Sequence, residues 1–207
     1  MNALLLNSIS QPFSTADIAR WLGISPASAR VTAVRYVQRG AIVRLKRDMY
    51  IGAGALARQT ERSLFAIANH LVVPSYVSLT TALSHYSVTT QQLRGVVESI
   101  ALKRTRTVQC DGIEFRYMRM RPDLYLGFDR VDGVFIASPE KALADAVYLS
   151  SMARYAFDAE ALDYTAIRID LVESFLSLTN EHAKRYWSDV CRTYKLSRRS
   201  RSKSLTS

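Results

Sequence analysis

The first apolar pattern of the chain is a short helical one close to the N-terminus. Apolar positions recur at helical spacing after Ser14, a favourable N-cap, and Asp17 stands three residues further on, in the capping-box position. Gly23 supplies the C-terminal stop of this predicted helix. The apolar positions are Ile18, Ala19 and Leu22.

A second helix is predicted to begin immediately afterwards. Ser25 is an N-cap, Pro26 suits the first helical position, where its missing N–H costs nothing, and Gly40 can take the left-handed conformation that ends a helix. The turn between the two helices is three or four residues long, which is the spacing of a helix-turn-helix.

The second helix has two faces at a period of 3.6 residues, and both carry apolar side chains. The chain resembles a helix-turn-helix, in which a bulky residue four positions before the glycine is usually buried, so we expect the face with Tyr36 to be buried. That stripe consists of Ala29, Ala33 and Tyr36, with Val37 on its edge. Roughly opposite lie Ala27, Ser28, Val31, Val34 and Arg35, with Arg30 on a flank. The reverse orientation, with the valines in the core, is the alternative that this pattern leaves open.

If the valine face is exposed, it carries side chains suited to duplex DNA. Arg30 and Arg35 can reach guanine edges or phosphates, and Val31 can touch a thymine methyl group. Ser28 lies near the helix N-terminus, where backbone donors meet phosphate. A solvated basic surface helix is the competing interpretation of these charges.

Residues 41–51 predict two short strands with Lys46, Arg47 and Asp48 at the turn between them. Two helices followed by such a hairpin have the outline of a winged helix-turn-helix. Lys46 and Arg47 are then expected to lie against the DNA backbone or the minor groove. The turn, the caps and the wing together favour the DNA-binding interpretation.

Positive charge is concentrated at the two ends of the chain. Residues 1–58 contain eight basic and two acidic side chains, residues 59–191 contain fourteen and sixteen, and residues 192–207 contain six and none. These net charges of +6, −2 and +6 sum to the formal charge of +10. Such a distribution favours binding to a polyanion, of which nucleic acid is the commonest.

Length and composition fit a protein of one or two domains with a real apolar core. The apolar patch in residues 1–10 lacks a positively charged region before it, so we interpret it as the first helix of the DNA-binding domain rather than a signal peptide. No run of eighteen apolar residues predicts a membrane span, and we expect a cytoplasmic protein. Cys110 and Cys191 have no metal spacing and are assigned no role.

Beyond a boundary at residues 52–55 the periodicity becomes mixed. Helices are predicted at 61–71 and 79–85, with a short strand at 75–78, and β-like segments follow at 96–102, 105–110 and 113–118. Further strands are predicted at 125–128 and 134–137. Asp111-Gly112 is a type I′ hairpin signal, and Asp132-Gly133 marks a second turn.

Ser138, Pro139 and Glu140 form a strong helix start, and this helix should continue to about residue 151. The C-terminal part is predicted to be helical at 170–178 and 180–194, and residues 196–207 have the composition of a disordered basic tail.

Over residues 14–151 the chain resembles the AbiE-type antitoxins. The resemblance rests on the predicted winged helix and on several segments that follow it, of which IASPEKALAD is the most specific. Those segments are SYVSLTTALSHYSVTTQ, GIEFRYMRM, LYLGF and VFIASPEKALADAVYL.

The resemblance implies a transcriptional repressor with a second, antitoxin domain. It implies binding to operator inverted repeats in double-stranded DNA at the protein's own promoter. It also implies action against a nucleotidyltransferase-like toxin without a tight antitoxin–toxin complex. The chain departs from the family in two places. The family's wing usually has a glycine before the aromatic residue, where this chain has Asp48 and Met49 before Tyr50. The C-terminal helices match no part of the family's pattern.

The charged residues of the ASPEKALAD segment allow two interpretations. Its helix start and its apolar stripe of Ala142, Leu143, Ala146 and Val147 fit packing on the preceding strands, so a structural role is favoured. Glu140, Lys141 and Asp145 remain interaction candidates if they are exposed on this helix.

No enzyme signature is complete, so we predict no catalytic residues, no metal site and no cofactor. Pro122-Asp123 resembles the start of a nuclease metal site, but no acidic-x-Lys strand follows it. His70, His85 and His182 are isolated, and no phosphate-binding glycine loop is present. A ligand-sensing winged-helix regulator, which needs a pocket in the second domain, is the leading alternative, and a DNA-acting nuclease is a weaker one.

The predicted fold class is therefore α+β. A winged helix-turn-helix is expected at residues 1–55, a mixed α/β antitoxin domain with C-terminal helices at 56–195, and a basic tail at 196–207.

Overall fold

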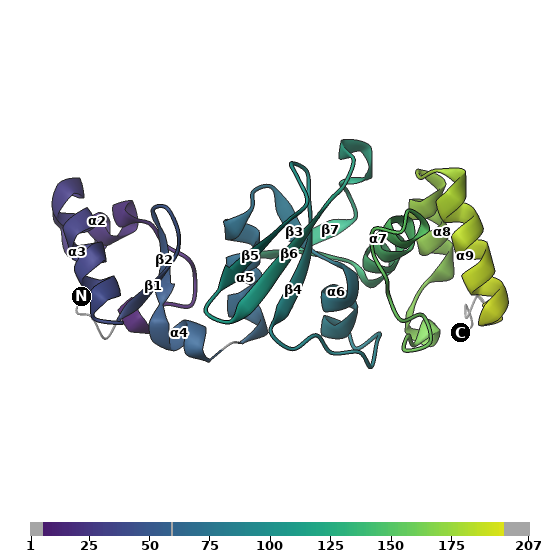
Figure 1. The fold of residues 1–207 in the computed structure, drawn as a ribbon, viewed down its shortest axis with the longest axis horizontal. Helices are drawn as coiled ribbons and strands as arrows, with labels where there is room; N and C mark the ends of the chain where they lie inside the picture. The colour runs from purple at the N-terminus through teal and green to yellow at the C-terminus, as the bar shows by residue number, and fades with distance from the viewer. Residues whose placement is uncertain (1–5, 59, 197–207) are drawn as a thin grey trace, which may run out of the picture.

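In the computed structural model, the winged-helix segment lies at one end of an elongated molecule, a six-stranded sheet lies in the middle, and three helices form the other end (Figure 1). The structure describes residues 6–58 and 60–196. Residues 197–207, and with them nearly all of the predicted tail, lie outside the described residues, as do residues 1–5 of the predicted first helix, whose described part, Leu6 and Asn7, is helical. The α+β class is confirmed.

The two predicted helices near the N-terminus are α2 (Thr15–Leu22) and α3 (Pro26–Gln38). Both halves of the capping box form: Ser14 Oγ accepts from Asp17 N at 3.2 Å, and Asp17 Oδ2 accepts from Ser14 N at 2.8 Å. Gly23 ends α2 at a φ of 64°, as its position predicts. The wing consists of β1 (Ile42–Lys46) and β2 (Met49–Gly52), which pair antiparallel.

The glycines at the predicted boundary hold two segments in close contact. Residues 53–57 form a short helix, α4 (Ala53–Ala57), instead of an extended linker. A Cβ on Gly52 would lie 2.3 Å from the carbonyl oxygen of Asn7, and Gly54 N donates to Asn7 Oδ1 at 2.7 Å. Gly52 is therefore required for the close approach of two backbones.

The second part contains a mixed sheet in the order β5-β6-β4-β3-β8-β7, with helices packed on it. β3 pairs parallel with β8 and β4 pairs parallel with β6, while the remaining neighbours are antiparallel. Its elements are α5 (Glu61–Leu71), β3 (Ser75–Val77), α6 (Leu79–His85), β4 (Val96–Ala101), β5 (Arg106–Cys110), β6 (Ile113–Arg119), β7 (Phe128–Val131), β8 (Val134–Ala137), α7 (Pro139–Ser151), α8 (Ile169–Ser177) and α9 (Glu181–Thr193).

The predicted hairpin turn at Asp111-Gly112 is confirmed, whereas one predicted strand begins later than expected. Asp111 and Gly112 both have positive φ, at 49° and 76°, which is the type I′ geometry that their sequence indicates. The strand expected at 125–128 instead begins at Phe128, because a 3-10 turn (Pro122–Leu124) and Gly127, at a φ of 75°, precede it.

The buried apolar side chains form two clusters. The smaller one lies within the winged helix, and its buried members are Leu6, Phe13, Ile18, Ala29, Ala33, Tyr36, Ile42 and Tyr50. The larger one fills the second part and also includes Leu45 and Ile51 of the wing. One side of the wing hairpin thus packs on the neighbouring core, which fixes the winged-helix segment against the second part of the molecule.

Candidate nucleic-acid interface

Helix α3 turns its valine face to solvent. Ala29, Ala33 and Tyr36 are buried in the smaller cluster, whereas Val31 is 68% exposed and Val34 is 56% exposed. The prediction that the stripe with Tyr36 faces the core is therefore confirmed, and the reverse orientation is excluded. Val31 and Val34 are three residues apart on this helix face, so together they form a small exposed apolar patch.

The polar residues that sequence reasoning selected on α3 share this outer surface. Ser28, Arg30 and Arg35 are all exposed. The Ser28 hydroxyl lies 2.9 Å from the hydroxyl of Ser25, at the N-terminus of the helix. The Arg35 guanidinium lies 5.9 Å from the centre of the Tyr36 ring, so its stem crosses the edge of the core while its charge faces outward.

The wing turn forms without a glycine and lies beside the start of α2. Asp48 takes the left-handed conformation, at a φ of 54°, where the resemblance led us to expect glycine. Its carboxylate accepts from the hydroxyl and the backbone N–H of Thr15, and these bonds lower the pKa of Asp48. The nearby positive charge of Arg30 lowers that pKa further, which places Arg30 close to the wing.

Arg47 and Lys46, both selected from the sequence, are in different situations. Arg47 is exposed at the wing turn. The Lys46 ammonium instead donates to the carbonyl oxygens of His70, at 2.5 Å, and Leu71, at 3.4 Å, and so caps the last turn of α5. Lys46 therefore joins the wing to the second part of the molecule.

A basic surface that sequence reasoning missed lies next to Lys46. Partial burial lowers the pKa of Lys46, and the positive charges of Arg106 and Lys103 lower it further, so these two residues are close to the wing. Lys103, Arg104 and Arg106 are exposed. None of the ion pairs among the described residues involves them.

Sequence reasoning did not detect this surface because it considered only the net charge of residues 59–191, which is −2. The triplet Lys103-Arg104-Thr105 followed by Arg106 was the available signal. The loop between β4 and β5 gathers these charges at the end of the sheet that faces the wing.

The ASPEKALAD charges are buried, which agrees with the favoured structural interpretation and removes them as exposed interaction candidates. Glu140, Lys141 and Asp145 are 9%, 3% and 1% exposed. They are enclosed because α6, α8, α9 and β8 all pack on α7. Burial of the charges themselves could not be predicted from the sequence, because charged residues are seldom fully buried unless they are paired.

Two of these charges satisfy one another inside the protein. Lys141 Nζ lies 2.6 Å from Asp145 Oδ1 and donates to the carbonyl oxygen of Leu124 at 2.8 Å. Asp145 Oδ2 accepts from the hydroxyls of Tyr76, at 3.0 Å, and Ser78, at 2.8 Å. Burial raises the pKa of Asp145, and Lys141 is the largest opposing influence. This network ties α7 to β3 and to the turn before β7.

The residues considered for catalysis do not assemble into a site. Among the described residues, no group of three or more His, Cys, Asp and Glu side chains could hold a metal ion. Asp123 pairs with Arg121, His85 Nδ1 lies 3.0 Å from Glu61 Oε2, and His70 Nδ1 lies 2.7 Å from the carbonyl oxygen of Ala66. Cys110 and Cys191 are free thiols.

Comparison with known proteins matches residues 3–51 to a family described as transcriptional regulator, AbiEi antitoxin. A solved structure with a similar fold is that of the RV2827C protein from Mycobacterium tuberculosis, with a TM-score of 0.53, 16% identity, and coverage of 88% of this chain and 72% of the other. No curated protein matches. Among the described residues, no helix is long and apolar enough to cross a membrane. The resemblance to AbiEi antitoxins is thus confirmed over the winged-helix segment, which is similar to transcriptional regulators of that family.

Proposed function

We propose that this protein is a sequence-specific DNA-binding repressor and the antitoxin of a type IV toxin–antitoxin pair. In this proposal α3 is the recognition helix, with Arg30 and Arg35 on guanine edges or phosphates, Val31 on a thymine methyl group and Ser28 near a phosphate. The observation that carries it is the outer face of α3, where exposed valines lie between exposed arginines.

We further propose that the duplex contacts more than the winged helix. Arg47 extends the surface of α3 along the wing, and Lys103, Arg104 and Arg106 continue it onto the end of the sheet. Unpaired cations of this kind fit successive phosphates of one DNA backbone. Lys46 supports this surface by holding the wing on α5 and is not assigned a phosphate contact.

The antitoxin half of the proposal is supported by the family match over residues 3–51. The protein would repress its own operon through inverted repeats and counter a nucleotidyltransferase-like toxin in the cytoplasm without a stable complex. It would act by binding, without catalysis or a cofactor. We propose the same division as the sequence does: residues 1–55 for DNA, 56–195 for the antitoxin activity and 196–207 as a basic tail.

The experiment has one arm for each half. The full-length protein is titrated into DNA from upstream of its own gene and into a shuffled duplex of equal length, at two salt concentrations. We expect tighter binding to the upstream DNA, and equal affinity for both would refute sequence-specific repression. In the second arm, co-expression with the adjacent nucleotidyltransferase gene should restore growth, and unrelieved toxicity would refute the antitoxin role.

A further inference from the structure

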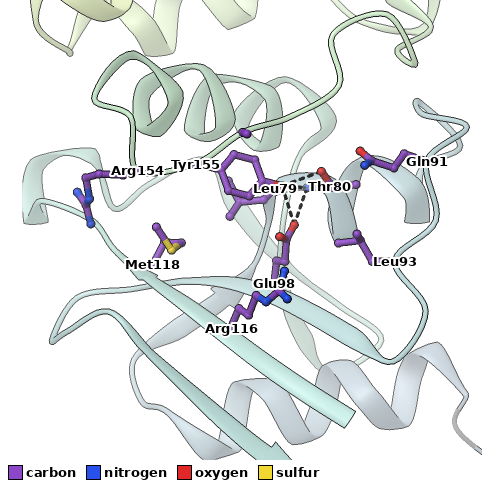
Figure 2. Close-up of a pocket in the computed structure, with 10 residues that line it drawn as sticks. Leu79, Thr80, Gln91, Leu93, Glu98, Arg116, Met118, Arg154 and Tyr155 are labelled. Atoms are coloured by element: carbon purple, nitrogen blue, oxygen red, sulfur yellow. Dashed lines mark hydrogen bonds between the residues drawn. The ribbon is translucent and has the colours of Figure 1, made fainter.

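A cavity of about 420 Å³ lies in the second part of the molecule. Its walls come from the start of α6, the outer face of β4 and β6, and the segment after α7 (Figure 2). This volume is within the range of small-molecule sites, which is about 300–1,000 Å³. The lining residues used below are Leu79, Leu93, Glu98, Met118, Arg154 and Tyr155.

The central group is Glu98, a carboxyl that is only 3% exposed. Its Oε2 accepts from Thr80 N at 3.1 Å and from the Tyr155 hydroxyl at 2.8 Å (Figure 2). The bond to Thr80 explains why a carboxyl stands at the start of α6, because it satisfies a backbone donor there. The backbone N–H of Thr81 also contacts the carboxyl and lowers its pKa, and Figure 2 shows no bond from the other lining residues to the second oxygen, Oε1.

Burial raises the pKa of Glu98, while the Tyr155 hydroxyl and the nearby charge of Arg116 lower it. The Glu98 carboxyl lines the cavity, and Oε1 is not one of the fully buried atoms that lack a partner, so this oxygen can accept a hydrogen bond from an N–H group of a ligand.

Backbone strain coincides with this wall. Leu79 is fully buried and has a φ of 58°, a left-handed conformation that is unfavourable for a bulky residue. It precedes Thr80, whose N–H and hydroxyl contact Glu98 and Tyr155 respectively. The strained backbone at Leu79 thus positions the N–H and hydroxyl groups of Thr80 that hold the Glu98 carboxyl and Tyr155. Backbone strain of this kind is commonest at functional sites.

The rest of the cavity adds apolar and cationic surface. Leu93 and Met118 supply apolar side chains. Arg154 lies at one end and donates to the carbonyl oxygen of Arg119 and to the Thr105 hydroxyl, with no carboxylate in either bond. Its positive charge is therefore available to an anion.

We propose that this cavity binds a nucleotide whose base carries an exocyclic amino group. The amino group donates to Glu98 Oε1, the flat base lies on Leu93 and Met118, and the phosphate pairs with Arg154. This proposal does not depend on DNA binding by α3, and it gives the second part of the molecule a ligand of its own.

The test is calorimetric titration of the full-length protein with CMP, AMP, GMP and UMP. The first three bases bear an amino group, whereas uracil presents a carbonyl oxygen at the corresponding position. We expect CMP to bind at least about tenfold more tightly than UMP, because UMP leaves Oε1 without a donor. The nucleoside cytidine should bind more weakly than CMP.

The decisive variant is Glu98→Gln, since its carbonyl oxygen keeps the bonds from Thr80 and Tyr155 and its amide now donates into the cavity. We expect the preference to invert, with UMP bound more tightly than CMP. A melting temperature equal to that of the wild type shows that the variant is folded. Arg154→Ala should reduce CMP binding to the level of cytidine, and Arg130→Ala on β7 should leave it unchanged.

Three results would overturn the proposal. One is that no nucleotide binds the wild-type protein, and the second is that CMP and UMP bind equally. The third is an unchanged order in folded Glu98→Gln. Equal binding of CMP and UMP would also identify binding of nucleotide phosphates at the basic DNA surface, where no base preference is expected.

Discussion

Helices α3 and α7 begin in the same way and end up in opposite environments. Each has thirteen residues, a serine N-cap and proline in the first turn. In α3 one face is buried and the other is exposed, with Val31 at 68%. In α7 every residue from Glu140 to Leu149 is buried, charges included. Local sequence sets the start of a helix, while the surrounding elements decide whether its polar groups face a partner or the core.

The largest expected effect is the loss of stability when the buried ion pair of α7 is removed. Lys141→Met leaves the Asp145 carboxylate without its cation, and we expect a loss of about 3–5 kcal/mol in the free energy of unfolding. Lys184→Met on α9 is the matched control, because Lys184 pairs with Glu181 at the surface and the pair contributes about 0–1 kcal/mol. Urea denaturation measures both, and equal losses would show that α7 gains nothing from its buried pair.

The next effect concerns the basic surface beyond the wing. Replacing Lys103, Arg104 and Arg106 by alanine should weaken binding to all DNA sequences about equally. The slope of log K against log salt should fall by roughly 0.9 for each phosphate that the variant no longer neutralises. Alanine at the exposed Arg62, Arg130 and Arg185 removes the same charge elsewhere. Identical slopes in both triple variants would confine the DNA surface to the winged helix.

The capping box of α2 has a smaller and pH-dependent contribution. The backbone hydrogen bond from Ser14 lowers the pKa of Asp17, so its stabilising effect is present above the unfolded pKa and disappears as the pH falls through the lower folded pKa. Asp17→Ala should cost about 1 kcal/mol at neutral pH. That difference should shrink well below pH 3.8, the ordinary value for the group. A cost that is independent of pH would contradict the assignment.

The smallest effect on stability is expected on the outer face of α3. Val31→Ala and Val34→Ala should each change the free energy of unfolding by no more than about 0.5 kcal/mol, because both side chains are exposed. Thermal unfolding checks this, and a destabilisation above about 2 kcal/mol would mean that these valines are part of a core. Operator affinity should fall in Val31→Ala if it contacts a thymine methyl group.

Sequence reasoning succeeded where the controlling interactions are local. The capping box, the glycine at the end of α2 and the Asp111-Gly112 hairpin involve neighbours in the chain, and all three formed as predicted. The orientation of α3 was also predicted correctly, but its periodicity alone left both faces open, and the resemblance to a helix-turn-helix decided between them.

The failures involve partners far apart in the sequence. The carbonyl acceptors of Lys46 lie 24 and 25 residues away, and the hydroxyls that satisfy Asp145 lie 69 and 67 residues away. Glu98 and Tyr155, 57 residues apart, were not singled out either. No local pattern indicates such contacts, so the sequence could propose chemistry only for the exposed face of α3 and the wing.

The central claim is that α3 reads DNA, and operator titration of the Arg30→Ala and Arg35→Ala variants tests it most directly. We predict a loss of about 1–3 kcal/mol in binding free energy for each variant that reads a base, with relaxed sequence preference in a footprint and an unchanged melting temperature. Arg130→Ala and Arg185→Ala serve as charge-matched controls. Affinity equal to that of the wild type in both α3 variants would contradict the account.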